Sequence, residues 1–140
     1  MTSARVKAIY TLGTSTHSPE EFVQLLSSHQ VEVVIDVRRF PTSRWEHFGK
    51  NELVRRLDVV GIDYIWLGEE LGGYRRGGYQ VFTTTTDFQT GVSKLEEIAQ
   101  QRRVVIICAE RFPWRCHRRF IGFELEKRGW QVTHIINGKD

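Results

Sequence analysis

The sequence predicts an α/β fold: one three-layer, Rossmann-like domain spanning residues 1–140, with a five-stranded parallel sheet. Three observations lead to this prediction. Five short apolar runs alternate with four amphipathic stretches, which is typical of successive βαβ units. Neither an internal repeat nor a low-complexity tract interrupts that alternation. The length also matches the commonest size of a domain with a single core.

The expected strands cover residues 6–13, 31–37, 62–67, 104–108 and 131–136. The first helix has a strong start, since Ser18 and Glu21 form a capping-box pattern and Pro19 occupies the first helical position. Asn51 is expected to cap the second helix and Gly61 to end it. The third helix is expected to begin near residues 86–87, and the fourth to carry residues 115–119 and to stop at residue 129.

Residues 68–80 contain five glycines among thirteen residues and are predicted to form one long loop. The loop also carries Arg75 and two tyrosines. Two interpretations remain open: it closes over a bound anion, or it is a flexible surface loop.

Polar and reactive residues follow each of the first four predicted strands. The connections at the opposite edge of the sheet are short and carry few reactive residues. Ligands of parallel α/β sheets bind outside the carboxyl ends of the strands, so this edge is the expected functional edge. We favour the strand order 3-2-1-4-5, which would bring His17, Asp36 and Cys108 together. The flavodoxin-like order 2-1-3-4-5 is the alternative.

The basic residues are mostly arginine, 15 of 20. This excess reflects either compositional bias or anion binding, because the guanidinium group binds phosphate or carboxylate with two hydrogen bonds. Nine arginines and five acidic residues are expected at the carboxyl edge, a local charge of +4 against +3 for the whole chain. The local excess favours anion binding. A pI near 9.1 is compatible with a nucleic-acid partner.

Both cysteines lie in residues 104–119, at the end of a predicted strand and the start of a predicted helix. Cys116 lies next to His117 and between arginines, which favours the thiolate, whereas Cys108 is either reactive or a small core residue. The arginine spacing does not fit a thiolate phosphatase or sulfurtransferase loop. Cys108, Cys116, His117 and His17 lack paired zinc-ligand spacing, so we expect no metal and no disulfide.

No apolar run is long enough to span a membrane, and the N-terminus lacks the apolar region of a secretory signal. A cytoplasmic protein without a membrane partner is therefore expected. The sequence indicates neither a cofactor nor an oligomeric state.

Several motifs together resemble the DUF488 family, a domain of unknown function. They are a Gly-x-Ser-x-His-like turn at 13–17, Asp-Val-Arg-x-x-Pro at 36–41, Leu-Gly-Gly at 71–73, and Cys-Ala-Glu followed by Cys-His-Arg at 108–118. The resemblance covers nearly the whole chain. It implies a three-layer α/β fold with a shared polar pocket, but it supplies no reaction.

The residues themselves favour an enzyme of hydrolase or transferase type that acts on a phosphate-bearing ligand, such as a nucleotide or a nucleic-acid component. Aromatic residues at 45, 48 and 114 offer stacking surfaces or simply cover the core. The alternative is a non-catalytic anion-binding or nucleic-acid-binding module. Asp36 and Glu110 act as acid and base, or they pair with arginines. The candidate catalytic residues are Glu110, Asp36, His17, Cys116 and His117, and the candidate substrate-binding residues are Arg38, Arg115, Arg118, Ser43 and Arg75.

Overall fold

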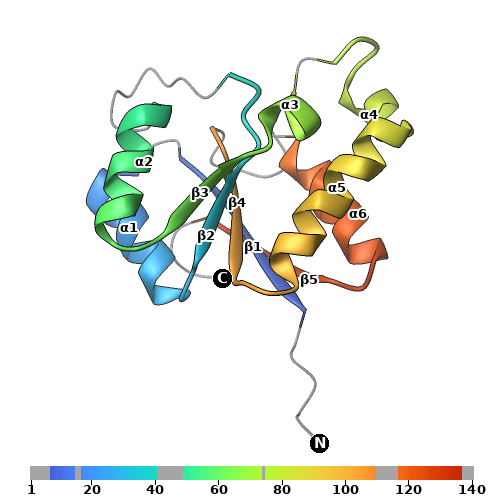
Figure 1. Cartoon of the computed structure of the whole chain (residues 1–140). Helices are drawn as coiled ribbons and strands as arrows, with labels where there is room; N and C mark the ends of the chain where they lie inside the picture. The colour runs from blue at the N-terminus through green and yellow to red at the C-terminus, as the bar shows by residue number, and fades with distance from the viewer. Residues whose placement is uncertain (1–6, 15–16, 41–48, 74, 110–116, 137–140) are drawn as a thin grey trace, which may run out of the picture.

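The computed structural model describes residues 7–14, 17–40, 49–73, 75–109 and 117–136 (Figure 1). Five strands form one sheet, and every pair of neighbouring strands is parallel. The predicted α/β class with a five-stranded parallel sheet is confirmed. The strands are β1 (Ala8–Gly13), β2 (Val33–Asp36), β3 (Asp63–Trp66), β4 (Val104–Cys108) and β5 (Gln131–Ile135).

Helices cover both faces of the sheet (Figure 1). The helices α1 (Pro19–Ser28) and α2 (Lys50–Val59) lie on one face, where Phe22, Leu26, Leu53 and Leu57 pack in one core cluster with residues of the strands. The opposite face carries the short α3 (Gly68–Leu71) and α4 (Tyr79–Phe82) together with the longer α5 (Thr86–Ala99) and α6 (Arg118–Lys127). Within the described residues, no helix is long and apolar enough to cross a membrane.

The strand order is β3-β2-β4-β1-β5, so the expected order 3-2-1-4-5 is wrong, and so is the flavodoxin-like alternative. The structure inserts β4, not β1, next to β2. All five residues of β4 are buried, and they form the most uniformly apolar run among the strands. Such a strand gains most from the central position, where neighbours and helices cover it on all sides. β1 instead pairs with β4 and β5.

The predicted starts of α1 and α5 are confirmed. Ser18 and Glu21 form the expected capping box of α1, and Thr85 caps α5 by accepting a hydrogen bond from the backbone of Phe88. The prediction that Asn51 caps the second helix is wrong, because α2 begins at Lys50 with Gly49 as its N-cap. In the described part of the chain, α6 begins at Arg118.

The predicted loop over residues 68–80 is not one long loop, because α3 and α4 lie within it. The Tyr79 ring packs against Phe82 and Phe88, and its hydroxyl donates to the Leu71 carbonyl at 2.7 Å. These contacts attach the segment to the core on the side of α5. The stabilisation from packing the Tyr79 ring therefore outweighs the conformational freedom that the five glycines give this segment.

Candidate functional site

The carboxyl end of β2 carries a buried ion pair. The Arg38 guanidinium donates to Asp36 through Nε at 2.9 Å and through Nη2 at 2.7 Å, and the Arg38 backbone N–H donates to the same carboxylate at 3.0 Å. Arg38 is 4% exposed and Asp36 is fully buried. Because two donors of Arg38 are occupied and its charge is neutralised, this pair stabilises the end of β2. Of the two roles considered for Asp36, the ion pair is the one observed.

Tyr64 of β3 completes this arrangement by donating its hydroxyl to the second Asp36 oxygen at 2.5 Å. Burial raises the pKa of Tyr64 well above its ordinary value, and the charge of Asp36 raises it further. The phenol therefore stays protonated and remains a donor. A neighbouring bond, from the Trp66 indole to the Arg38 carbonyl at 2.8 Å, fixes the Trp66 ring over the end of β3.

His117 lies beside the same strand end, with Nε2 2.9 Å from the Val37 carbonyl. Since a carbonyl only accepts, Nε2 carries the proton and the neutral ring has its lone pair on Nδ1. Burial lowers the pKa of His117, and the charges of Arg75 and Arg118 act in the same direction. The side chain is thus a neutral imidazole at pH 7, a state suited to accepting a proton.

Gly73 lies beside Nδ1 of His117, since a Cβ atom at this position would be 3.5 Å from that nitrogen. The ring itself packs against Tyr79, with centroids 5.0 Å apart. His117 therefore has one face in the aromatic cluster of α4 and its Nδ1 edge toward the glycine-rich segment.

Arg75 is bonded to the backbone of that segment. Its Nε donates to the Gly72 carbonyl at 2.8 Å, its Nη2 donates to the Glu69 carbonyl at 2.6 Å, and its guanidinium carbon lies 3.9 Å from the Phe82 ring centroid. Burial lowers the pKa of Arg75, and the positive charge of Arg39 lowers it further. Two guanidinium groups close enough to repel each other would both be stabilised by a bound anion.

A cavity of about 380 Å³ opens at this edge, between the end of β2, the start of α2 and the end of β3. The Lys50 ammonium lies 5.3 Å from the centroid of the Trp66 ring. Among the described residues, neither Arg39 nor Lys50 forms an ion pair with an acidic side chain. The cavity thus combines two cations with two aromatic rings and one carboxylate. Its lining residues are Arg39, Phe40, Lys50, Trp66 and Glu69.

Arg118, a predicted anion-binding residue, is fully buried at the start of α6. Its Nη1 donates to the Thr11 hydroxyl of β1 at 3.1 Å, and that oxygen lies 2.6 Å from Nδ1 of His134 in β5. Burial lowers the pKa of His134, and the charge of Arg118 lowers it further. Arg118 therefore connects α6 to the two strands beneath it.

His17 lies on the other side of the central strand, beside the first turn of α1. Hydrogen bonds from Ser18 lower the pKa of Glu21, and the charge of His17 contributes in the same direction. The structure thus brings together Asp36, Arg38 and His117, with Arg75 and Arg118 close enough to influence His117 electrostatically. The expected strand order is wrong, but β2, β4 and β1 are still neighbours in the observed order. Asp36 is in register with Ile107, and Gly13 at the end of β1 is in register with Cys108, so the strand ends expected to carry the site do lie side by side.

Cys108 ends β4, is 1% exposed and is disulfide-bonded. The expectation that the chain has no disulfide is therefore wrong. That expectation rested on the small number of cysteines and on the absence of paired zinc-ligand spacing, and neither excludes a single disulfide. An oxidised sulfur offers no thiolate, so Cys108 is neither a nucleophile nor a zinc ligand in this state. Among the described residues, no group of three His, Cys, Asp or Glu side chains forms a potential metal site.

Four of the predicted site residues lie outside the described residues: Glu110, Cys116, Arg115 and Ser43. The aromatic residues considered for stacking, at positions 45, 48 and 114, lie outside them as well. Their proposed roles stay predictions.

Sequence reasoning missed Tyr64, Thr11 and the cavity residues Lys50 and Trp66. It counted Arg39 among the nine arginines of the carboxyl edge but did not name it as a site residue. Arg118 could have been recognised as a buried residue, because it shares the apolar stripe of α6 with Ile121 and Leu125. Tyr64 offered no such signal, since its contact with Asp36 depends on how β2 and β3 pair.

Comparison with known proteins gives a family but no characterised relative. Neither a curated protein nor a solved structure matches the chain. The family model described as "Domain of unknown function DUF488" matches residues 18–123. This match covers well over half of the chain and includes the Asp36–Arg38 pair, His117 and the described cavity. The chain therefore belongs to the DUF488 family.

Proposed function

We propose that the protein is an enzyme of hydrolase or transferase type whose carboxyl edge binds a phosphate-bearing planar ligand, a nucleotide or a nucleic-acid component. The observation that carries this proposal is the cavity in which Arg39 and Lys50 lie beside the Trp66 ring. Cations without acidic partners bind phosphate, and an indole ring held by its own hydrogen bond offers a rigid stacking surface for a base.

The same geometry revises which arginines bind the ligand. Arg38 is engaged with Asp36, Arg118 with Thr11, and Arg75 with backbone carbonyls. Arg39 and Lys50 make no such bonds among the described residues, so the phosphate is assigned to them. Arg75 contributes its nearby charge to the same edge.

His117 is the best-supported general base. Its ring is neutral at pH 7, Nε2 is bonded to Val37, and Nδ1 is the atom that would take a proton. Asp36 is less suited to proton transfer, because it is fully buried and its oxygens accept from Arg38 and Tyr64.

A non-catalytic binding module is the second candidate. It is favoured by the complete burial and neutralisation of the Asp36–Arg38 pair, which removes one of the expected acid–base residues from contact with a ligand.

Thermal unfolding in the presence of nucleoside monophosphates, sugar phosphates, adenosine and inorganic phosphate tests the binding. A ligand at 100 times its dissociation constant adds about 2.7 kcal/mol to the free energy of unfolding. We expect nucleoside monophosphates to stabilise the protein and adenosine to stabilise it far less. Absence of stabilisation by every phosphate-bearing compound would contradict both candidate functions.

Turnover of the stabilising compounds then separates the two candidates. We expect His117→Gln to abolish turnover while it preserves nucleotide binding. Binding by the wild-type protein without turnover of any stabilising phosphate ester, or of an ester with an added acceptor alcohol, would favour the binding module.

A further inference from the structure

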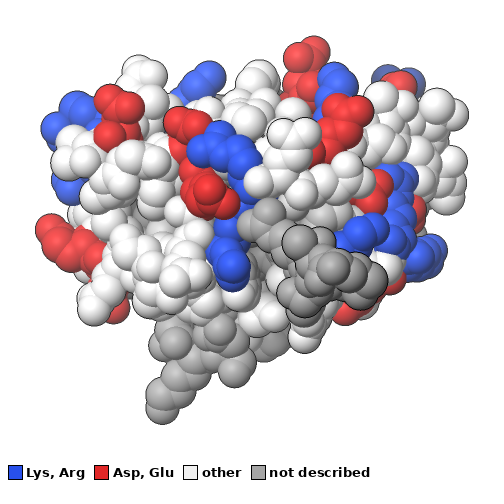
Figure 2. Space-filling model, turned by 60° about the horizontal axis from the view of Figure 1, so that its bottom comes forward, with Lys and Arg blue, Asp and Glu red and all other residues white. Residues whose placement is uncertain are grey.

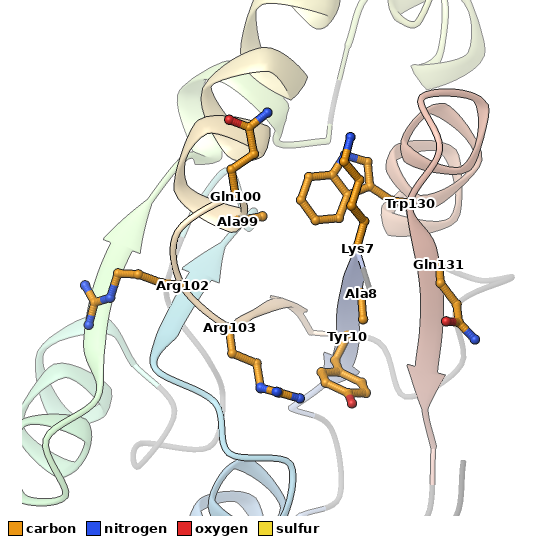
Figure 3. A pocket seen from close by; sticks show the side chains of 9 residues that line it. All are labelled: Lys7, Ala8, Tyr10, Ala99, Gln100, Arg102, Arg103, Trp130 and Gln131. Carbon is orange, nitrogen blue, oxygen red and sulfur yellow. The ribbon is translucent and has the colours of Figure 1, made fainter. Parts of the chain in front are cut away.

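A second cavity, of about 570 Å³, lies at the amino edge of the sheet, where β1, β4 and β5 begin (Figure 3). Its volume is within the range of small-molecule sites. The cavity is formed where Lys7 precedes β1, Arg103 precedes β4 and Trp130 precedes β5. The backbone there is fixed, because the Gln131 N–H donates to the Lys7 carbonyl at 2.7 Å.

The charged residues lining this cavity are all basic. The backbone of Arg103 is occupied, since its N–H donates to a Glu32 carboxylate oxygen at 2.7 Å and its carbonyl accepts from the Val33 N–H at 3.1 Å. Its guanidinium forms no ion pair among the described residues. The adjacent Arg102 differs, because its Nη1 lies 2.6 Å from Asp63. Arg103 therefore keeps donors for a ligand.

Lys7 is the second cation of the cavity, with its ammonium 5.4 Å from the centroid of the Trp130 ring. Burial acts to raise the pKa of Glu96, but hydrogen bonds from Trp130 and Arg128 lower it below its ordinary value, and the charge of Lys7 acts in the same direction. Glu96 is already bonded to the Trp130 indole at 2.8 Å and to Arg128 at 2.6 Å. Lys7 thus lies over an aromatic ring, and the nearby acid is satisfied by other donors.

Two aromatic residues stand at opposite sides of the space between these cations. In Figure 3, Lys7 lies against Trp130, the Arg103 side chain extends toward Tyr10, and Arg102 points away. Figure 2 turns this side of the molecule forward and shows basic side chains gathered near the middle of the face, with acidic ones beside them. An anionic group between Lys7 and Arg103 would leave an attached ring next to Tyr10 or Trp130.

We propose that this cavity is a second ligand site, which binds a small anion attached to a flat ring and is separate from the carboxyl-edge site. Lys7 and Arg103 bind the anionic group, and the rings of Tyr10 and Trp130 border the planar group. The two sites lie at opposite edges of one sheet, so each binds without residues of the other.

Titration of the full-length protein with phenyl phosphate, followed by two-dimensional amide NMR, tests the proposal. We expect saturable shifts of the Ala8 and Gln131 amides and of the Trp130 indole signal. The double variant Lys7→Gln/Arg103→Gln should raise the dissociation constant measured from these signals at least about tenfold. Arg102→Gln is the control for diffuse charge, since it removes one positive charge from the neighbouring position whereas the double variant removes two, and it should change that constant by less than about twofold.

Three results would overturn the proposal: an unchanged dissociation constant in the double variant, an equal loss in Arg102→Gln, or inorganic phosphate binding as tightly as phenyl phosphate. Equal loss would mean diffuse charge attraction, and equal phosphate affinity would mean that no ring is recognised. Shifts of the Arg39 and Lys50 amides report the carboxyl edge in the same spectra. The double variant should leave those shifts intact, so failure at one edge is distinguishable from failure at the other.

Discussion

The arginines at the carboxyl edge of the sheet and those at the amino edge are held in different ways. Arg38 and Arg118 at the carboxyl edge are buried and bonded to other side chains. Arg103 at the amino edge borders a cavity, and its guanidinium forms no ion pair among the described residues. A guanidinium whose donors are occupied stabilises the fold, whereas one whose donors remain can bind a ligand. Counting charges by edge does not separate these two kinds. Arg39 is a carboxyl-edge arginine of the second kind, since it lines a cavity and forms no ion pair among the described residues.

The largest expected difference between the edges is in stability. Arg38→Gln would leave the buried Asp36 carboxylate without its cation, which should lower the free energy of unfolding by about 3–5 kcal/mol. The same substitution at Arg103 should change it by no more than about 0.5 kcal/mol, because the Arg103 side chain has no hydrogen bond or ion pair to lose within the described part of the chain. Urea unfolding of both variants measures the contrast. Similar losses in the two variants would mean that the edges do not differ in this way.

Glycine substitutions provide a second contrast. A Cβ at Gly72 would lie 2.2 Å from the Gly68 carbonyl oxygen and 2.6 Å from Cα of Arg39. Both atoms belong to the backbone, so Gly72→Ala should cost about 1–3 kcal/mol and displace Arg39 from the cavity.

The control lies at the amino edge of the sheet, where a Cβ at Gly129 would meet no atom within 4 Å. Its φ of 95° makes Gly129→Ala strained, at a cost of about 1–2 kcal/mol. Calorimetric titration with AMP should then show weaker binding only for Gly72→Ala. Normal AMP binding by a folded Gly72→Ala protein would mean that the position of Arg39 is unimportant.

The pH dependence of stability is the smallest expected effect. Burial lowers the pKa of His117 in the folded protein, so below the ordinary value of about 6.5 the unfolded chain takes up a proton that the folded one resists. The contribution of His117 to the free energy of unfolding is therefore complete above that pH. It is lost as the pH falls through the lower pKa that His117 has in the folded protein. We expect His117→Gln to flatten the fall in stability below pH 6.5 and Arg103→Gln to leave it unchanged. A fall that is equally steep in all three proteins would refute the assigned protonation state.

Most strands and helices could be predicted because their sequence patterns are local. The β-branched run of β4 and the capping box of α1 predicted their elements directly. The strand order could not be predicted from the order of the strands along the chain. The uniformly apolar sequence of β4 was nevertheless a usable signal of its central position. The Asp36–Arg38 pair was visible in the spacing of the two residues, whereas the bond from Tyr64 required the pairing of β2 with β3. The amino-edge cavity was missed because side chains from separate segments create it.

The central claim is that Arg39 and Lys50, two cations that line the carboxyl-edge cavity and form no ion pair with an acidic side chain among the described residues, bind the phosphate. Calorimetric titration with AMP tests it most directly, using the wild-type protein, Arg39→Gln, Lys50→Gln and the amino-edge variant Arg103→Gln. Loss of one charge-assisted hydrogen bond, about 1.5–3 kcal/mol, should weaken AMP binding by about 10- to 150-fold in each carboxyl-edge variant. Arg103→Gln should bind AMP at the carboxyl edge as the wild type does. Full AMP affinity in both Arg39→Gln and Lys50→Gln would contradict the claim.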